Sequence, residues 1–244
     1  MKKIYCSIFI VAFIISFLSC RTETLEKDAI TTGSLFKEMI DLAGLAVFPD
    51  PAYRAVQYSS FDRRSRLPGG PDWFANSDGF GKEPIPNFEK VLKEPDEEGI
   101  GGYLIADVKG PGAIIRLWSA AITGKIKLFI DDQPSPLFDG LSIGFFHSVY
   151  DSFPEVKNLN KDRLKKTIYQ RDAAYTPIPF AKGMRLVWVG DLQTIHFYQV
   201  GVRLYEEGTK VISFSPEDLA TYSETINRVT ASLSDPDQNL NPRS

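Results

Sequence analysis

The feature that most constrains the fold is a succession of short β-rich runs, bounded by glycine and proline, that begins near Gly101. The runs cover residues 103–108, 113–122, 125–130, 184–189, 194–205 and 210–214. Turn sequences such as Lys109-Gly110-Pro111-Gly112 and Thr123-Gly124 separate the first three. Many short strands with little helix between them are typical of a β-sandwich or jelly roll. We therefore predict a mainly β domain with jelly-roll architecture.

Two short helices are expected at the ends of this domain. Residues 34–46 place apolar side chains at helical spacing and precede Pro49. At the other end, Ser215-Pro216-Glu217-Asp218 has the capping residue, first-position proline and early acids of a helix start. An apolar stripe then continues to Leu233. The domain is predicted to cover residues 34–233, with a flexible polar tail at 234–244.

The N-terminus has the pattern of an export signal. Two lysines precede an apolar run that ends at Ser19-Cys20, and the run is shorter than the roughly 20 residues that a spanning helix needs. We predict a signal peptide at 1–19, acylation of Cys20, a lipoprotein linker at 20–33, and export to the membrane surface on the acyl anchor. Because the chain contains only Cys6 and Cys20, an acylated Cys20 accounts for the leftover thiol. The alternative is an ordinary signal peptide in which Cys20 is incidental.

Residues 56–98 form the segment in which a binding site is easiest to place. They are rich in glycine, proline, aspartate and asparagine with little periodicity, which indicates a long irregular loop. Sugar sites use flat aromatic faces and planar polar groups, and residues 59–64 and 69–79 supply both. The alternative is a loop whose aspartates and asparagines only cap its own backbone.

Other kinds of chemistry find little support. The two histidines, His147 and His196, are far apart, and His196 lies in a strand pattern, where a packed or surface histidine is expected. The sequence has no zinc-spaced Cys/His cluster, no Gly-x-Ser-x-Gly elbow and no phosphate-binding glycine loop. With a net charge of −3 it offers no basic footprint for nucleic acid. We predict no metal, no cofactor and no nucleic-acid partner.

Several motifs together resemble glycoside hydrolase family 172. In chain order they are Tyr58-Ser59-Ser60-Phe61-Asp62-Arg63, Asp72-Trp73-Phe74, Ala106-Asp107-Val108-Lys109-Gly110-Pro111-Gly112, Ile115-Arg116-Leu117-Trp118-Ser119, Leu128-Phe129-Ile130-Asp131-Asp132, Pro177-Ile178-Pro179-Phe180 and Tyr198-Gln199-Val200. The resemblance covers roughly residues 34–215. It implies the first half of a double jelly roll that assembles into cyclic trimers or hexamers and cleaves α-D-fructofuranosyl or α-D-arabinofuranosyl linkages with retention.

Retaining hydrolysis uses two carboxyl groups roughly 5 Å apart. In the family both are glutamates of the second jelly roll, which has no counterpart in these residues, so the catalytic residues remain unknown and we expect no turnover by the chain alone. The loop motif implies a set of sugar-facing candidates. These are Asp62, Arg63, Asp72, Trp73, Asn76 and Asp78.

Three functions follow from different classes. The first is a truncated or split furanosidase-like lipoprotein, inactive alone or complemented by a second-half chain. The second is a carbohydrate-binding lipoprotein whose ligand is a furanoside-containing oligosaccharide or polysaccharide. The third is a structural jelly-roll subunit, either in a homo-oligomer or packed on the missing half.

Overall fold

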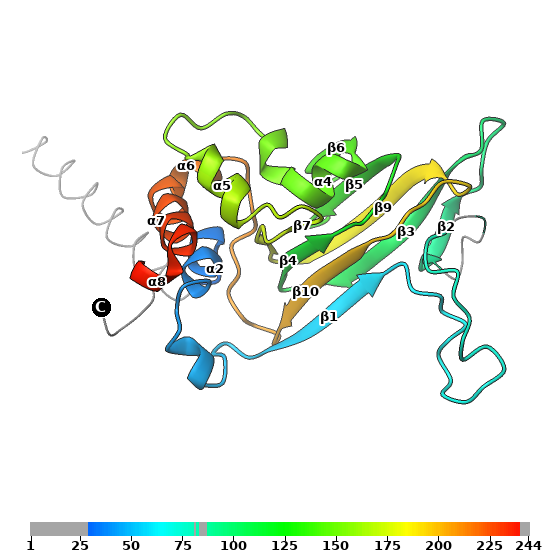
Figure 1. The fold of residues 1–244 in the computed structure, drawn as a ribbon, viewed down its shortest axis with the longest axis horizontal. Coiled ribbons are helices and arrows are strands. Elements are labelled where there is room, and N and C mark those ends of the chain that lie inside the picture. The colour runs from blue at the N-terminus through cyan, green and yellow to red at the C-terminus, as the bar shows by residue number, and fades with distance from the viewer. Residues whose placement is uncertain (1–28, 81, 83–86, 240–244) are drawn as a thin grey trace, which may run out of the picture.

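The computed structural model describes residues 29–80, 82 and 87–239 and folds them into two antiparallel sheets, with most of the helices at one end (Figure 1). The first sheet has the order β1–β10–β4–β7, and β8 also pairs with β4. The second has the order β2–β3–β9–β5–β6. The strands are β1 Tyr53–Ser59, β2 Lys90–Lys93, β3 Ile100–Lys109, β4 Gly112–Trp118, β5 Lys125–Ile130, β6 Phe138–Leu141, β7 Ala173–Ala174, β8 Ile178–Phe180, β9 Gly183–Asp191 and β10 Gln199–Tyr205.

The helices close one end of the sandwich and part of one side. They are α2 Thr32–Glu38, η1 Gly44–Ala46, α4 Ser142–Ser148, η2 Val149–Ser152, α5 Lys161–Thr167, α6 Asp218–Thr221, α7 Ser223–Ser234 and α8 Pro236–Asn239. Helix α7 packs against both α2 and α5, while α4 lies near β4, β6 and β7 (Figure 1). The Thr32 hydroxyl donates to the Asp218 carboxylate at 2.5 Å, which ties the first helix of the described chain to α6.

The main core lies between the two sheets. Tyr103 and Ile105 of β3 and Trp188 of β9 belong to one buried cluster with Ile114 of β4 and Val200 of β10. Because β3, β4 and β5 alternate between the sheets, the turn after Lys109 carries the chain from one layer to the other. This arrangement confirms the predicted mainly β sandwich with a short N-terminal helix and a C-terminal helix.

The strand predictions succeed best in the buried middle of the sheets. Strand β5 has the predicted bounds. Strand β3 extends the predicted run by three residues at its start and one at its end, and β9 extends it by one at its start and two at its end. Strand β4 ends at Trp118, before the predicted 122, and β10 begins only at Gln199. The run 210–214 is not a strand, because only Val211 forms a β-bridge, with Ile30.

The sequence suggested an irregular loop over the whole segment 56–98, but the structure places strands in parts of it. Strand β1 occupies its start and β2 lies near its end. Strand β1 pairs along its whole length with β10, from Tyr53 opposite Tyr205 to Ser59 opposite Gln199. A partner nearly 150 positions away in the chain decides this strand, and a local pattern does not contain that information.

Both predicted helices differ from the structure in their bounds. The first begins at Thr32, where Thr31 forms a capping box with Ser34, and ends at Glu38. It does not reach residue 46, since Asp41 accepts from the Gly44 N–H at 3.0 Å and starts a separate 3₁₀ turn. The C-terminal helix begins at Asp218, three residues later than Ser215, and breaks at Tyr222.

Several predictions fall on residues outside the described part of the chain. They are the signal peptide at 1–19, Cys20, most of the 20–33 linker and the last residues of the 234–244 tail. Packed residues begin at Ala29 and Ile30, earlier than the expected domain start at residue 34. Within the described ranges, no helix combines the length and the apolar character that crossing a bilayer requires.

Candidate functional site

The connection from β1 to β2, residues 60–89, forms a lobe at the end of the sandwich away from α7 (Figure 1). We refer to it as the β1–β2 loop; its described residues are 60–80, 82 and 87–89. All six sugar-facing candidates lie in it. The structure divides them into residues that hold the loop together and residues that face solvent.

Asp62 is the residue around which the loop folds. Its side chain is fully buried, and the carboxylate accepts from the Arg64 guanidinium at 2.6 Å and from the Ser77 N–H at 3.0 Å. Hydrogen bonds from Arg64 are the largest cause that holds the pKa of this carboxyl well below its usual range. Asp62 therefore joins the start of the loop to its middle, at Ser77, and does not face solvent, contrary to its place in the sugar-facing set.

Asp78 completes the same closure from the other side. Its carboxylate accepts from the Asp62 N–H at 2.5 Å, and its carbonyl oxygen accepts from the Ser60 hydroxyl at 3.0 Å. Asp78 has a φ of 24°, in the left-handed region that aspartate tolerates better than most residues. The carboxylates of Asp62 and Asp78 thus accept hydrogen bonds from within the loop. At these two positions the structure agrees with the alternative in which the aspartates cap the backbone of the loop.

Arg63 lies between the closure and the surface. Its guanidinium pairs with the Glu89 carboxylate at 2.6 Å and stands 4.8 Å from the Phe61 ring centroid. The Arg63 side chain is largely buried, whereas that of Glu89 is about 41% exposed. Sequence reasoning did not include Glu89 among the sugar-facing residues, because its partner lies 26 positions earlier and no local motif joins them.

The solvent-facing part of the loop carries the remaining candidates. Asp72, Trp73 and Asn76 are exposed, and the neighbouring Phe74 is 90% exposed. The backbone here is held by turns, because the Ser65 hydroxyl donates to the Ala75 carbonyl at 2.7 Å. An indole, a phenyl ring, a carboxylate and an amide therefore sit on a fixed backbone within five consecutive positions. Phe74 and Phe61 are exposed aromatic residues that the candidate set missed, although both stand inside the quoted motifs.

An aromatic layer supports the loop from below. Phe88, fully buried, stacks on Tyr103, Trp188, His196 and Tyr198 with centroid distances of 5.1–5.6 Å. Asn87 and His196 add a hydrogen bond of 3.0 Å, and burial lowers the pKa of His196. His196 is thus a packed side chain, the first of the two structural roles, packed or surface, that the sequence left open.

Two described acidic groups, Glu89 and Asp107, lie near the start of the loop. Glu89 and Asp107 both raise the pKa of Tyr58, after the larger effect of burial, so all three side chains lie near the β1 edge. Glu89 forms an ion pair with Arg63. Among the described residues no group of three or more histidine, cysteine, aspartate or glutamate side chains could hold a metal. The site can bind a ligand by stacking and hydrogen bonding.

Comparison with known proteins adds one match. Residues 51–222 match the family model described as the GH172 first beta-sandwich domain. The matched range includes both sheets, the whole β1–β2 loop and the start of the C-terminal helical region. No curated protein matches the chain.

Proposed function

Because the chain belongs to glycoside hydrolase family 172 through its first β-sandwich domain, we propose that it binds a furanoside-containing oligosaccharide or polysaccharide on the exposed face of the β1–β2 loop. The observation that carries this proposal is the division of the loop. Asp62 and Asp78 fix its backbone from inside, and Trp73, Phe74, Asp72 and Asn76 are left to face solvent. Such preorganisation lowers the entropic cost of binding.

The chemistry of the exposed side chains fits a neutral sugar. Aromatic faces contact the C–H surfaces of a sugar ring, while carboxylate and amide groups exchange hydrogen bonds with its hydroxyls. The exposed cations among the described residues of the loop are Arg64, Arg66 and Lys82, and Arg64 already pairs with the Asp62 carboxylate.

In this proposal the domain supplies binding and not the reacting carboxylates. A retaining furanosidase needs a nucleophile and an acid/base about 5 Å apart, and the family resemblance implies that these belong to a second jelly roll. That second roll is supplied either elsewhere in the protein or by a separate chain. The protein is further proposed to be exported and acylated at Cys20, which places the loop among extracytoplasmic polysaccharides.

Isothermal titration of the purified protein with α-linked arabinofuranose and fructofuranose oligosaccharides tests the binding. We expect weak binding by the wild type. The affinity should fall about tenfold in Trp73→Ala, since one aromatic contact is worth on the order of 1 kcal/mol. Leu67→Ala is the matched control, because Leu67 is also exposed in the same loop and has no group that suits a sugar. Equal binding by both variants, or no binding by the wild type, would contradict the proposal.

A further inference from the structure

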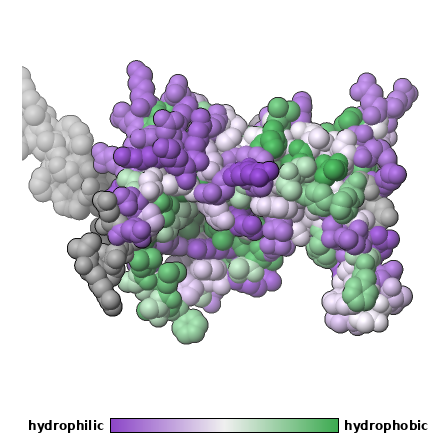
Figure 2. Space-filling view, in the orientation of Figure 1, coloured by the Kyte–Doolittle hydropathy of each residue, from purple (hydrophilic) through white to green (hydrophobic). Residues whose placement is uncertain are grey.

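A second exposed surface lies at the other end of β1, in the segment Leu42–Phe48. Leu42, Leu45, Val47 and Phe48 are all exposed, Leu45 to 82% and Phe48 to 98%. Hydrophobic residues gather at this corner of the molecule, below the helical end (Figure 2). Scattered surface leucines are ordinary, but a contiguous apolar projection marks an interaction surface.

The apolar segment has a defined backbone. The Asp41 carboxylate accepts from the Gly44 N–H at 3.0 Å, and the 3₁₀ turn η1 follows directly. The Ala46 N–H then donates to the Ala43 carbonyl at 3.1 Å. The turn therefore holds Leu45 and Phe48 outward on a fixed support, and η1 itself has no buried residue.

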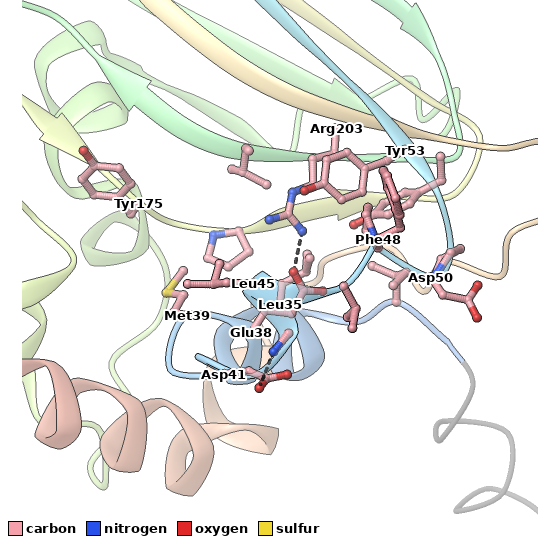
Figure 3. Close-up of a pocket in the computed structure, with 18 of the residues that line it drawn as sticks. Leu35, Glu38, Met39, Asp41, Leu45, Phe48, Asp50, Tyr53, Tyr175 and Arg203 are labelled. Atoms are coloured by element: carbon pink, nitrogen blue, oxygen red, sulfur yellow. Dashed lines mark hydrogen bonds and ion pairs between the residues drawn. The ribbon is translucent and has the colours of Figure 1, made fainter. Parts of the chain in front are cut away.

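Behind the segment is a cavity of about 830 Å³ between α2, η1 and the first sheet (Figure 3). Leu35, Met39, Tyr53 and Ile115 contribute to its largely apolar wall. Arg203 and Glu38 form an ion pair at 2.5 Å across the wall, which Asp41 and Asp50 also line (Figure 3).

The chain enters the fold beside this surface. Ala29, the first described residue, and Ile30 line a neighbouring hollow together with Asp41, Asp50 and Pro51. Eight residues, Arg21 to Asp28, separate Ala29 from Cys20, the acylation site of the proposed function. Fully extended they reach at most about 30 Å. An acylated Cys20 would therefore keep this end of the domain next to the bilayer.

We propose that Leu42, Leu45, Val47 and Phe48 form a membrane-contact surface that inserts into the lipid interface and orients the domain. The proposal rests on the proposed acylation, which supplies the anchor, while the segment supplies the orientation. With the helical end held at the bilayer, the β1–β2 loop at the opposite end of β1 faces away from the membrane (Figure 1).

Two other occupants fit the surface less well. The intervening residues Arg21–Asp28 contain a single large apolar side chain, Leu25, and so cannot cover four exposed ones. Nearby charges are mixed, with Lys37 and Lys210 beside Asp41 and Asp50 around the neighbouring hollow. Mixed charges do not favour a protein partner of either net charge. Insertion of apolar side chains into zwitterionic or anionic lipid does not depend on such a preference.

The test uses the acylated protein, extracted in detergent and reconstituted into phosphatidylcholine vesicles. Phe48→Cys carries an environment-sensitive fluorophore, and Phe74→Cys, 90% exposed at the opposite end of β1, is the matched control. We expect lipids with a quencher on the acyl chain to reduce the emission at position 48 about twofold and to leave position 74 unchanged. Adding Leu45→Asp to the Phe48→Cys protein should restore most of the emission.

Fatty-acid labelling of the wild type and of Cys20→Ser separates the two proposals. Without label in the wild type, the anchor is absent and both the acylation and the membrane contact are overturned. With label but no lipid quenching at position 48, acylation stands and the membrane-contact surface is overturned. Cross-linking of two copies through position 48, with protection from aqueous iodide, would assign the surface to a second copy instead.

Discussion

Strand β1 separates two surfaces that differ in how they are built, although both expose large apolar side chains. The apolar segment Leu42–Phe48 precedes the strand, and the β1–β2 loop follows it. The loop folds around the buried Asp62 carboxylate, whose oxygens accept from Arg64 and from the Ser77 N–H. The apolar segment has one exposed capping interaction, between Asp41 and Gly44.

The difference concerns what kind of partner each surface can discriminate. Internal polar bonds fix where the exposed Trp73, Asp72 and Asn76 stand relative to one another, so that a ligand with a particular arrangement of hydroxyls is preferred. The apolar segment offers only hydrocarbon, which rewards the removal of area from water without regard to direction. A shaped polar ligand suits the loop, and a fluid lipid interface suits the segment.

The largest expected effect concerns the aromatic residues that pack beneath the loop. Phe88→Ala removes a fully buried ring that stacks on four neighbours. We expect the free energy of unfolding in urea to fall by about 3–5 kcal/mol. Phe74→Ala, in the same loop but exposed, should change it by less than about 0.5 kcal/mol. Equal effects of the two variants would mean that the loop is not supported from below.

A smaller effect is expected when the central carboxylate is neutralised. Asp62→Asn keeps the size of the side chain but weakens its acceptors for Arg64 and Ser77, which should cost about 2 kcal/mol of unfolding free energy. Proteolysis within the β1–β2 loop should accelerate in parallel. Asp72→Asn, an exposed carboxylate in the same loop, is the control and should leave both measurements unchanged.

The same residue gives the stability a pH dependence with a definite sign. The pKa of Asp62 is depressed in the folded state, chiefly by the Arg64 hydrogen bonds, so the folded protein binds fewer protons there than the unfolded chain. Its contribution is complete above the unfolded pKa, about 4, and disappears as the pH falls toward the folded value. Asp62→Asn should lack this contribution to acid sensitivity, and identical acid profiles would argue against the buried pair.

The sequence predicted those parts of the molecule where local pattern and burial agree. Strand β5 was predicted with its observed bounds, since its alternating side chains and flanking turns are all local signals. Strand β1 was missed, because its pairing with distant β10 decides it. The long helix at 34–46 failed, because the Asp41 side chain competes for the backbone at Gly44.

Within the candidate site, the sequence indicated the loop but not the direction of its side chains. Asp62 and Asp72 look equivalent in composition, yet one is buried under an ion pair and the other is exposed. Their difference depends on the contact of Asp62 with Ser77 and Asp78, about fifteen positions later. The importance of Glu89 was hidden for the same reason, since its pairing with Arg63 forms only when the loop closes.

The smallest expected effect concerns the apolar segment, where we predict almost no change in the free energy of unfolding. Leu45→Asp and Phe48→Asp replace side chains that are 82% and 98% exposed, so the fold loses little buried area. Each should change the unfolding free energy in aqueous buffer by less than about 0.5 kcal/mol, and solubility should rise as exposed hydrocarbon is removed. Urea denaturation and light scattering of both variants measure this.

A loss of several kcal/mol of unfolding free energy would mean that these side chains are covered by protein in the free state, and the surface would then not be available to lipid. A small loss together with loss of lipid quenching is the combination that an orienting membrane contact requires, because a surface kept for a partner contributes to stability only when that partner is bound.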